Sequence, residues 1–259
     1  MKKHTFVLCA YGESPYLEDC VKSLMAQTVR SEIILSTSTP NAHIDRIANA
    51  YGLRVAINTG ERGITGDWNF GFSQAESEFI TIAHQDDVYE PRYTEEILRH
   101  AEKYKKPIML FTDYFELRHG ERVYQNKLLK IKRLMNVGFR ISKRSRFMRL
   151  RVLSLGNSIC CPSVTYCRAA CEGFRFDGNF KFACDWDAWD RLARQKGAFV
   201  YIPEALMGHR IHADSETTKQ TEGEGRAREE YTMYRRYWPK FIARRLAKFY
   251  AKGAESNQI

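Results

Sequence analysis

The 259-residue sequence contains no apolar run that approaches the ~20 residues needed to span a membrane. No signal-peptide pattern precedes its first apolar segment, residues 5–10. These absences argue against a membrane-spanning protein. We therefore expect a cytoplasmic protein, and any contact with a membrane would be peripheral, at the inner face of the cell membrane.

Metal-binding cysteine pairs are also lacking, because no Cys-x-x-Cys motif occurs among the seven cysteines. An odd number of cysteines in a chain of this length indicates reduced thiols rather than a disulfide framework. Without ligand-type spacing, a structural zinc site is not expected.

Acidic residues are missing from one long segment. From Arg122 to Cys171 there are 12 Lys or Arg and no Asp or Glu. A second basic segment, Arg226 to Lys252, has nine Lys or Arg against two Glu. Because the whole chain has a formal net charge of +10, the remainder is acidic. The pattern predicts two basic surfaces that face an anionic partner. The acidic body argues against nucleic acid as that partner.

The order of apolar patterns indicates the fold class. Apolar, β-branched segments alternate with segments of helical periodicity, and Gly52 follows the second helix as a typical end signal. Such alternation with short connections predicts an α/β fold with a mostly parallel sheet flanked by helices. The expected strands are 5–10, 32–36, 53–57, a strand from Phe79 whose tip carries Asp86 and Asp87, 108–112, 163–166 and 199–202, and the expected helices include 16–27, 42–51 and 185–192.

One strand ends in two adjacent carboxylates. The apolar run from Phe79 leads directly to Asp86 and Asp87, before Pro91 interrupts the chain. Ligands bind at the carboxyl ends of strands in α/β sheets, and paired carboxylates there suit Mg²⁺ or Mn²⁺. A solvated turn is the alternative, and the dipeptide alone favours it.

A second acidic pair lies at the expected start of a helix. Asp185 and Asp187 are flanked by Trp186 and Trp189. A carboxylate at a helix N-terminus can act as a cap. Beside large apolar rings, its pKa can also rise towards the value that a general base needs. The segment leaves both roles open for both acids.

The segment His209-Arg210-Ile211-His212 follows the last expected strand. In an extended chain Arg210 and His212 point to one side and His209 to the other. The segment could thus offer an imidazole to a metal and donors to a diphosphate, or it could be a polar surface loop. Asn157 and Ser158, after the basic stretch, fit ordinary turn chemistry.

Together these segments resemble family 2 glycosyltransferases of the GT-A fold, over about residues 4–218. The likeness lies in the order of several motifs, each weak alone. The motifs are the strand and turn Thr5–Glu13, the helix Leu17–Thr28, the loop Gly63–Asn69, His84-Gln85-Asp86-Asp87 in place of the Asp-x-Asp metal motif, the helix Asp185–Leu192 and the late segment His209–His212.

The resemblance implies an inverting enzyme that moves a sugar from a nucleotide-diphosphate donor to a hydroxyl of a glycan or lipid-linked acceptor, in bacterial surface polysaccharide synthesis. It implies Asp185 as the catalytic base, and Mn²⁺ or Mg²⁺ held by Asp86 and His212. The implied donor-binding residues are Ala10, Tyr11, Glu13, Thr37, Gly63, Asn69, Gln85, Asp86 and Arg210, with Asp87, Asp187, His84 and His209 as secondary candidates.

The sequence departs from the family pattern at two places. His84 replaces the first Asp of the metal motif. The segment Ser36–Thr39 stands where the family usually has acidic residues that contact the nucleotide base. The second departure leaves the identity of the nucleotide open.

We expect a glycosyltransferase domain at 1–225, with a basic insertion or lid at 127–156, and a basic amphipathic C-terminal helix at 226–259. Trp238, Phe241 and Phe249 lie on the apolar side of that helix. An anionic membrane surface would suit such a helix, and packing on the domain is the alternative.

Two other classes of protein share part of this pattern. A nucleotidyltransferase that makes sugar nucleotides would carry a Gly-rich phosphate loop followed by Lys, which Tyr11–Pro15 is not. A non-catalytic nucleotide- or nucleic-acid-binding protein would have no need of both Asp86 and Asp185.

Overall fold

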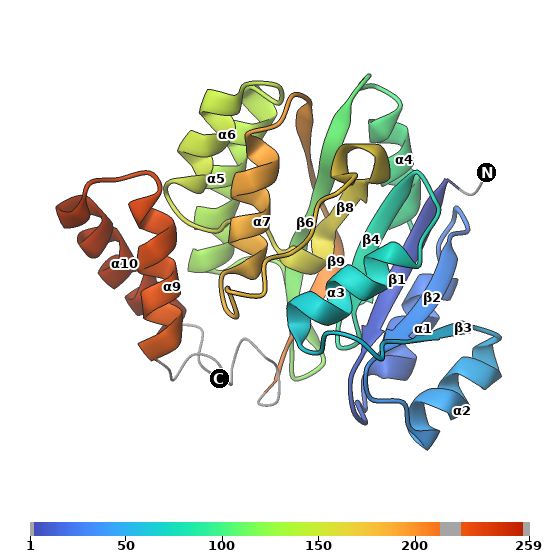
Figure 1. The fold of residues 1–259 in the computed structure, drawn as a ribbon. Coiled ribbons are helices and arrows are strands. Elements are labelled where there is room, and N and C mark those ends of the chain that lie inside the picture. Colours follow the sequence, from blue (N-terminus) through green and yellow to red (C-terminus); the bar gives the residue numbers. More distant parts are fainter. Residues whose placement is uncertain (1–2, 213–223, 256–259) are drawn as a thin grey trace.

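A computed structural model describes residues 3–212 and 224–255, with side chains up to residue 250. Residues 213–223 lie outside the described part. The molecule is a twisted sheet with helices on both faces, followed by a C-terminal helical pair at one side (Figure 1).

The first half of the chain forms the parallel part of the sheet, in the order β3-β2-β1-β4. The prediction of alternating strands and helices is confirmed here, and Gly52 ends α2 in the left-handed conformation (φ 62°). The elements are β1 (His4–Ala10), α1 (Leu17–Met25), β2 (Glu32–Thr37), α2 (Ala42–Tyr51), β3 (Arg54–Ile57), α3 (Ile64–Ser73) and β4 (Phe79–His84).

The second half makes the sheet mixed. β8 (Val164–Cys167) lies between β4 and β6 (Pro107–Arg118) and is antiparallel to both. β6 runs parallel to the long β9 (Ala198–Ile211), whose end pairs with β5 (Val88–Tyr89). The prediction of a mostly parallel sheet therefore holds for the first four strands and for the β6–β9 pair, and β8 interrupts it because it enters from the edge where β4 ends. The remaining elements here are α4 (Tyr93–Ala101) and β7 (Glu121–Val123).

The basic segment forms two helices, α5 (Lys127–Ile141) and α6 (Arg146–Leu153). Leu129, Phe139 and Leu153 are fully buried, so these helices pack on the sheet through one face. The opposite face of α5 is apolar and exposed at Leu134 (74%) and Ile141 (76%). Whether the segment moves as a lid stays a prediction.

The C-terminal segment forms two helices, α9 (Glu224–Arg235) and α10 (Lys240–Glu255), rather than one. Trp238, Leu246 and Tyr250 pack against the core cluster that includes α7 (Cys184–Ala193). Of the two alternatives for the apolar side of this segment, packing on the domain applies to Trp238, Leu246 and Tyr250. Phe241 and Phe249 remain exposed. Within the described residues, no helix is long and apolar enough to cross a membrane.

Candidate active site

The candidate residues gather at one edge of the sheet, at the carboxyl ends of β1 and β4. The end of β9 and the first turn of α7 lie at the same lower edge in Figure 1. β5 pairs with β9 directly after the acidic turn and so holds that turn against residues 209–212. The acidic turn and residues 209–212 therefore lie side by side, although they are distant in sequence.

Asp87 is the buried anchor of the acidic turn. Its side chain is 0% exposed. One carboxylate oxygen, Oδ1, accepts a 2.9 Å hydrogen bond from the Arg210 backbone N–H and contacts Nδ1 of His209 at 3.1 Å. Burial works to lower the pKa of His209, but the charge and hydrogen bond of Asp87, together with the charge of Asp86, raise that pKa above its ordinary value. Asp87 and His209 thus tie the turn to β9.

Asp86 lies beside the positively charged end of the same segment. Its Oδ2 is 3.1 Å from Nε2 of His212, and the Arg210 guanidinium donates to its backbone carbonyl at 2.8 Å. Burial works to raise the pKa of Asp86. The hydrogen bond from His212 and the charges of His84 and His209 together hold that pKa below its usual range. Asp86 is therefore kept as a carboxylate.

Tyr16 supports this arrangement from the start of α1. Its ring lies 4.4 Å from the Arg210 guanidinium carbon and 4.8 Å from the His212 ring. Tyr16 thus packs against both side chains and restricts them to positions beside the turn.

The expected donor-binding residues border the acidic turn along β1 and β2. Gln85 pairs with the backbone of Tyr11 through both its amide atoms, at 2.9 and 3.1 Å. Ala10 ends β1 beside Thr37, the last residue of β2. The Thr37 hydroxyl accepts from the backbone N–H of Thr39 at 3.0 Å. Tyr11 and Glu13 are exposed.

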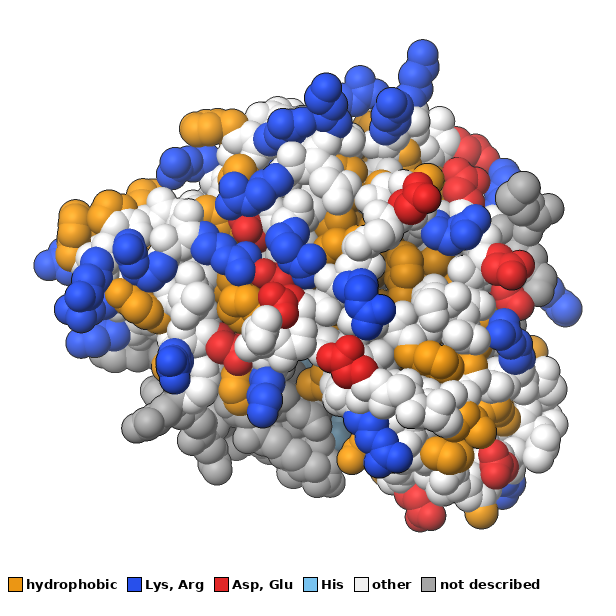
Figure 2. All heavy atoms as spheres, in the orientation of Figure 1, with side chains coloured by type: hydrophobic (Ala, Val, Ile, Leu, Met, Phe, Trp, Pro, Cys, Tyr) orange, Lys and Arg blue, Asp and Glu red, His pale blue; other side chains and the backbone are white. Residues whose placement is uncertain are grey.

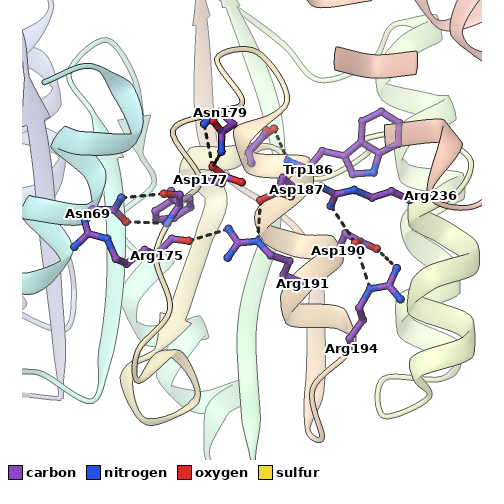
Figure 3. A network of polar contacts seen from close by, with 12 residues as sticks. Asn69, Arg175, Asp177, Asn179, Trp186, Asp187, Asp190, Arg191, Arg194 and Arg236 are labelled. Atoms are coloured by element: carbon purple, nitrogen blue, oxygen red, sulfur yellow. Dashed lines mark hydrogen bonds and ion pairs between the residues drawn. The ribbon is translucent and has the colours of Figure 1, made fainter. Parts of the chain in front are cut away.

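Two further expected donor residues lie on α3. Gly63 is the N-cap of that helix, at a positive φ of 95°. Asn69 uses both side-chain amide atoms on the Phe176 backbone, at 2.8 and 3.0 Å (Figure 3). In this structure Asn69 joins α3 to the loop before α7, and its contact with a donor stays a prediction.

Asp185 lies in the first turn of α7 and is partly exposed. Its Oδ2 accepts a 2.9 Å hydrogen bond from the Asn157 side-chain amide, and its Oδ1 accepts from the Trp186 backbone N–H. Burial raises the pKa of Asp185 and outweighs these two hydrogen bonds, which lower it. A carboxylate with a raised pKa and an exposed side is suited to take up a proton.

Asp187 has a different environment, although the sequence left the two acids equivalent. It is 1% exposed, and its oxygens meet Arg191 at 2.8 Å and Arg236 at 2.7 Å. Arg236 also pairs with Asp190, which Arg194 contacts from the next turn of α7. Figure 3 shows these arginines converging on the two buried carboxylates. Asp187 is therefore committed to holding α7 in place.

The loop before α7 is held by α9. The Glu229 carboxylate accepts hydrogen bonds from the backbone N–H groups of Lys181, Phe182 and Ala183, at 2.8 to 3.0 Å. Tyr234 on the same helix packs edge-to-face on Trp186, with ring centroids 5.0 Å apart. The C-terminal helices thus form part of the structure that positions Asp185.

Asp185 and the acidic turn affect the same two thiols, Cys160 and Cys161. Burial raises the pKa of Cys161, and the negative charges of Asp185 and Asp87 raise it further. Cys160 is affected by the same two carboxylates. Both carboxylates therefore disfavour a thiolate at either cysteine.

Residues 5–172 match the family model described as glycosyl transferase family 2. The chain belongs to this family. An uncharacterized glycosyltransferase of Haemophilus influenzae is 22% identical over 229 residues, which cover 80% of this chain and 65% of that protein. The minor teichoic acid biosynthesis protein GgaB of Bacillus subtilis is 22% identical over 227 residues, covering 83% of this chain and 24% of that protein. The chain thus spans less than two thirds of either relative.

Solved structures share the fold of this glycosyltransferase family 2 chain. The mannosyltransferase PcManGT from Pyrobaculum calidifontis, in complex with GDP-Man and Mn²⁺, has a TM-score of 0.69 at 12% identity, covering 100% of this chain and 76% of that one. Residues 1–349 of S. aureus TarS give 0.64 at 14% identity, covering 95% and 69%. The predicted GT-A fold is confirmed.

A divalent cation fits the acidic turn of this family 2 member. Candidate ligand atoms of His84, Asp86 and Asp87 lie within 4.8 Å of one another. Among the described residues, Oδ2 of the fully buried Asp87 has no hydrogen-bond partner. An unpaired buried carboxylate oxygen is costly, and a bound cation would offset that cost.

Three residues of the site escaped the sequence interpretation. Tyr16 was part of an apolar helical pattern, and only its contact with Arg210 reveals its role. Asn157 had the pattern of an ordinary turn residue, so the turn interpretation missed its bond to Asp185. Glu229 was counted as one of two acids in a basic helix. No local sequence signal could identify the partners of Asn157 and Glu229, because those partners are distant in sequence.

Proposed function

We propose that this glycosyltransferase inverts the anomeric centre of a nucleotide-diphosphate sugar while transferring it to an acceptor hydroxyl. The observation that carries the proposal is that one edge of the sheet offers both a carboxylate suited to take up a proton and side chains suited to bind a diphosphate. Asp185 has a pKa raised by burial, and Asp86 lies with Arg210 and His212 at the acidic turn.

Asp185 acts as the general base. The acceptor hydroxyl approaches its exposed side and transfers its proton to the carboxylate as the oxygen attacks the anomeric carbon. Asn157 and the Trp186 backbone N–H fix the orientation of the carboxylate. Attack from the side opposite the leaving group gives inversion.

Arg210 and His212 stabilise the departing nucleoside diphosphate. Both side chains lie at the acidic turn, where the Tyr16 ring packs against the Arg210 guanidinium and the His212 imidazole. Asp86 and His212 would hold Mn²⁺ or Mg²⁺, which, when bound, neutralises charge on the diphosphate. Preorganised positive charge of this kind lowers the barrier because it is in place before the negative charge develops.

The nucleotide is recognised between β1 and β2. Ser36 and Ser38 are buried there, and the Ser38 hydroxyl donates to Asp67 at 2.9 Å.

A panel of UDP, GDP and dTDP, with and without Mn²⁺, tests the function in a thermal-shift assay. We expect one diphosphate to raise the melting temperature only with metal, and nucleic acid to have no effect. Release of pyrophosphate instead of nucleoside diphosphate would indicate a nucleotidyltransferase.

The acceptor is a glycan or lipid-linked saccharide that carries negative charge, as in bacterial surface polymers. Burial raises the pKa of Asp185, and the positive charges of Lys132 and Arg226 partly oppose this, so both cations lie near the base. They can pair with an acceptor phosphate. The name of GgaB, which refers to teichoic acid biosynthesis, supports an acceptor of this class.

The acceptor is presented at an anionic membrane surface. The outward face of α5 combines exposed Leu134 and Ile141 with the lysines of its first turn, and Phe147 of α6 is 66% exposed. Figure 2 shows hydrophobic and basic side chains interspersed over α10 at the left edge. At an anionic bilayer surface, the apolar side chains would insert between the lipids and the basic side chains would contact the anionic headgroups.

Co-sedimentation with liposomes tests this contact. We expect the protein to sediment with phosphatidylglycerol vesicles and not with neutral phosphatidylcholine vesicles. The double variant Leu134→Ser, Ile141→Ser should lose most of the binding. Ile57→Ser, at an exposed position on β3, is the matched control and should bind like the wild type. Equal sedimentation with both lipids would contradict the proposal.

A further inference from the structure

His84 occupies the end of β4, directly before the acidic turn. Its Nδ1 is 3.9 Å from Oδ2 of Asp87. Its other ring nitrogen, Nε2, is buried and has no hydrogen-bond partner among the described residues. Both ring nitrogens are therefore available to a ligand.

The facing carboxylate oxygen is equally unsatisfied. Asp87 is 0% exposed, and its Oδ1 is already occupied by Arg210 and His209. Its Oδ2, which faces His84, has no hydrogen-bond partner among the residues that the structure describes. The 3.9 Å between this oxygen and Nδ1 of His84 is too long for a hydrogen bond, so each atom remains available to a bound cation.

The His84 ring is held in position. Trp68 of α3 stacks on it with ring centroids 5.5 Å apart and an interplanar angle of 18°. Trp68 is in turn held edge-on by Phe176, at 5.1 Å. A fixed ring loses little freedom on binding a metal, which favours a built ligand over an accidental neighbour.

A second cluster of similar composition shows the contrast. Glu96, His100 and Glu204 also bring ligand atoms together. There, Arg92 and Arg99 donate to both carboxylate oxygens of buried Glu96. That cluster is neutralised by side chains, so it has no need of a cation.

We propose that His84 is a metal ligand, which supplies an imidazole nitrogen beside the carboxylates of Asp86 and Asp87. The inference rests on the proposed function, which puts a divalent cation at this turn. An imidazole in place of a carboxylate favours first-row transition ions over Mg²⁺, which prefers oxygen ligands. With His84 in place of the first Asp of the motif, the metal site of this chain should therefore prefer Mn²⁺ over Mg²⁺.

Binding of Mn²⁺ followed by electron paramagnetic resonance tests the assignment without measuring turnover. Free Mn²⁺ is titrated against wild type, His84→Asp and Asp86→Asn, with the metal alone and with added UDP or GDP. Pulsed measurements then detect nitrogen bound to Mn²⁺. His119→Asp, at an exposed turn, is the matched control, and thermal melting verifies that each variant is folded.

We expect His84→Asp to lose one nitrogen coupling and to lower the ratio of Mn²⁺ to Mg²⁺ affinity by ~10-fold. His119→Asp should change neither. If folded His84→Asp keeps the nitrogen coupling pattern and the affinity ratio of the wild type, His84 is not a ligand.

Asp86→Asn separates this inference from the proposed function. If it abolishes Mn²⁺ binding while His84→Asp leaves the nitrogen signal unchanged, the metal site stands and only the role of His84 is overturned. If the wild type binds no Mn²⁺ under any of these conditions, the metal site itself is overturned, and the inference falls with it.

Discussion

Asn157 donates a 2.9 Å hydrogen bond to Asp185, and it is in turn held by the Tyr250 hydroxyl, which donates to its backbone carbonyl at 3.2 Å. Asp185 is therefore linked through Asn157 to Tyr250 of α10. A hydrogen bond to the charged form lowers the pKa of Asp185, against the larger effect of burial.

Replacing Asn157 by Ala should shift the acidic limb of the pH–rate profile to higher pH. Without the amide, the carboxylate is less stabilised, so its pKa rises and a larger fraction of Asp185 is protonated and inactive at a given acidic pH. The measurement is kcat/KM against pH. Ser158→Ala changes the neighbouring residue, which bonds Asn136 instead, and should leave the limb in place. An unshifted limb in Asn157→Ala would contradict the assigned contact.

Asp185→Asn should make the protein more stable near neutral pH. The folded state raises the pKa of Asp185, so the stability associated with its protonated form is present at low pH and is lost as pH rises through the folded pKa. Asparagine stays neutral and avoids this loss. In urea unfolding, the gain should shrink as the pH is lowered towards about 4. A gain that is independent of pH would not fit this origin.

Glu229→Ala should reduce both stability and turnover. Three backbone N–H groups before α7 lose their acceptor, which we expect to cost about 2 kcal/mol in unfolding free energy. Because the loop leads to Asp185, kcat should fall more than KM rises. Arg228→Ala, at an exposed position on the same helix, is the control. Turnover like that of the wild type would show that α9 does not position the base.

Arg236→Ala should destabilise the protein by about 3 kcal/mol, since it leaves Asp187 and Asp190 buried with one partner fewer. Arg244→Ala, at an exposed site on α10, should change the unfolding free energy by less than about 0.5 kcal/mol. Chemical denaturation measures both. Equal effects of the two substitutions would mean that the carboxylates do not depend on Arg236.

Local patterns were sufficient for the elements that form the first half of the sheet. The β-branched run before Asp86 predicts a strand, and the glycine after α2 predicts the end of that helix, each from the local sequence alone. The order of motifs also brought Asp86, His212 and Asp185 to one edge. The antiparallel direction of β8 had no such signal, because it depends on how the chain returns from α6.

The missing information concerns partners that are distant in sequence. Asp185 and Asp187 lie in the same helical turn, and partners distant in sequence distinguish them, Asn157 for Asp185 and Arg236 for Asp187. Trp238 belongs to an amphipathic pattern that fits a membrane or a protein surface equally well. Its indole donates to the Ser154 carbonyl at 2.8 Å, a contact that no helical periodicity contains.

The central claim is that Asp185 is the base of a glycosyl transfer. The most direct test compares Asp185→Asn with the wild type in release of nucleoside diphosphate from the sugar nucleotide whose diphosphate stabilises the protein. We predict at least ~100-fold slower transfer with unchanged binding of the nucleotide. Turnover near that of the wild type would contradict the claim.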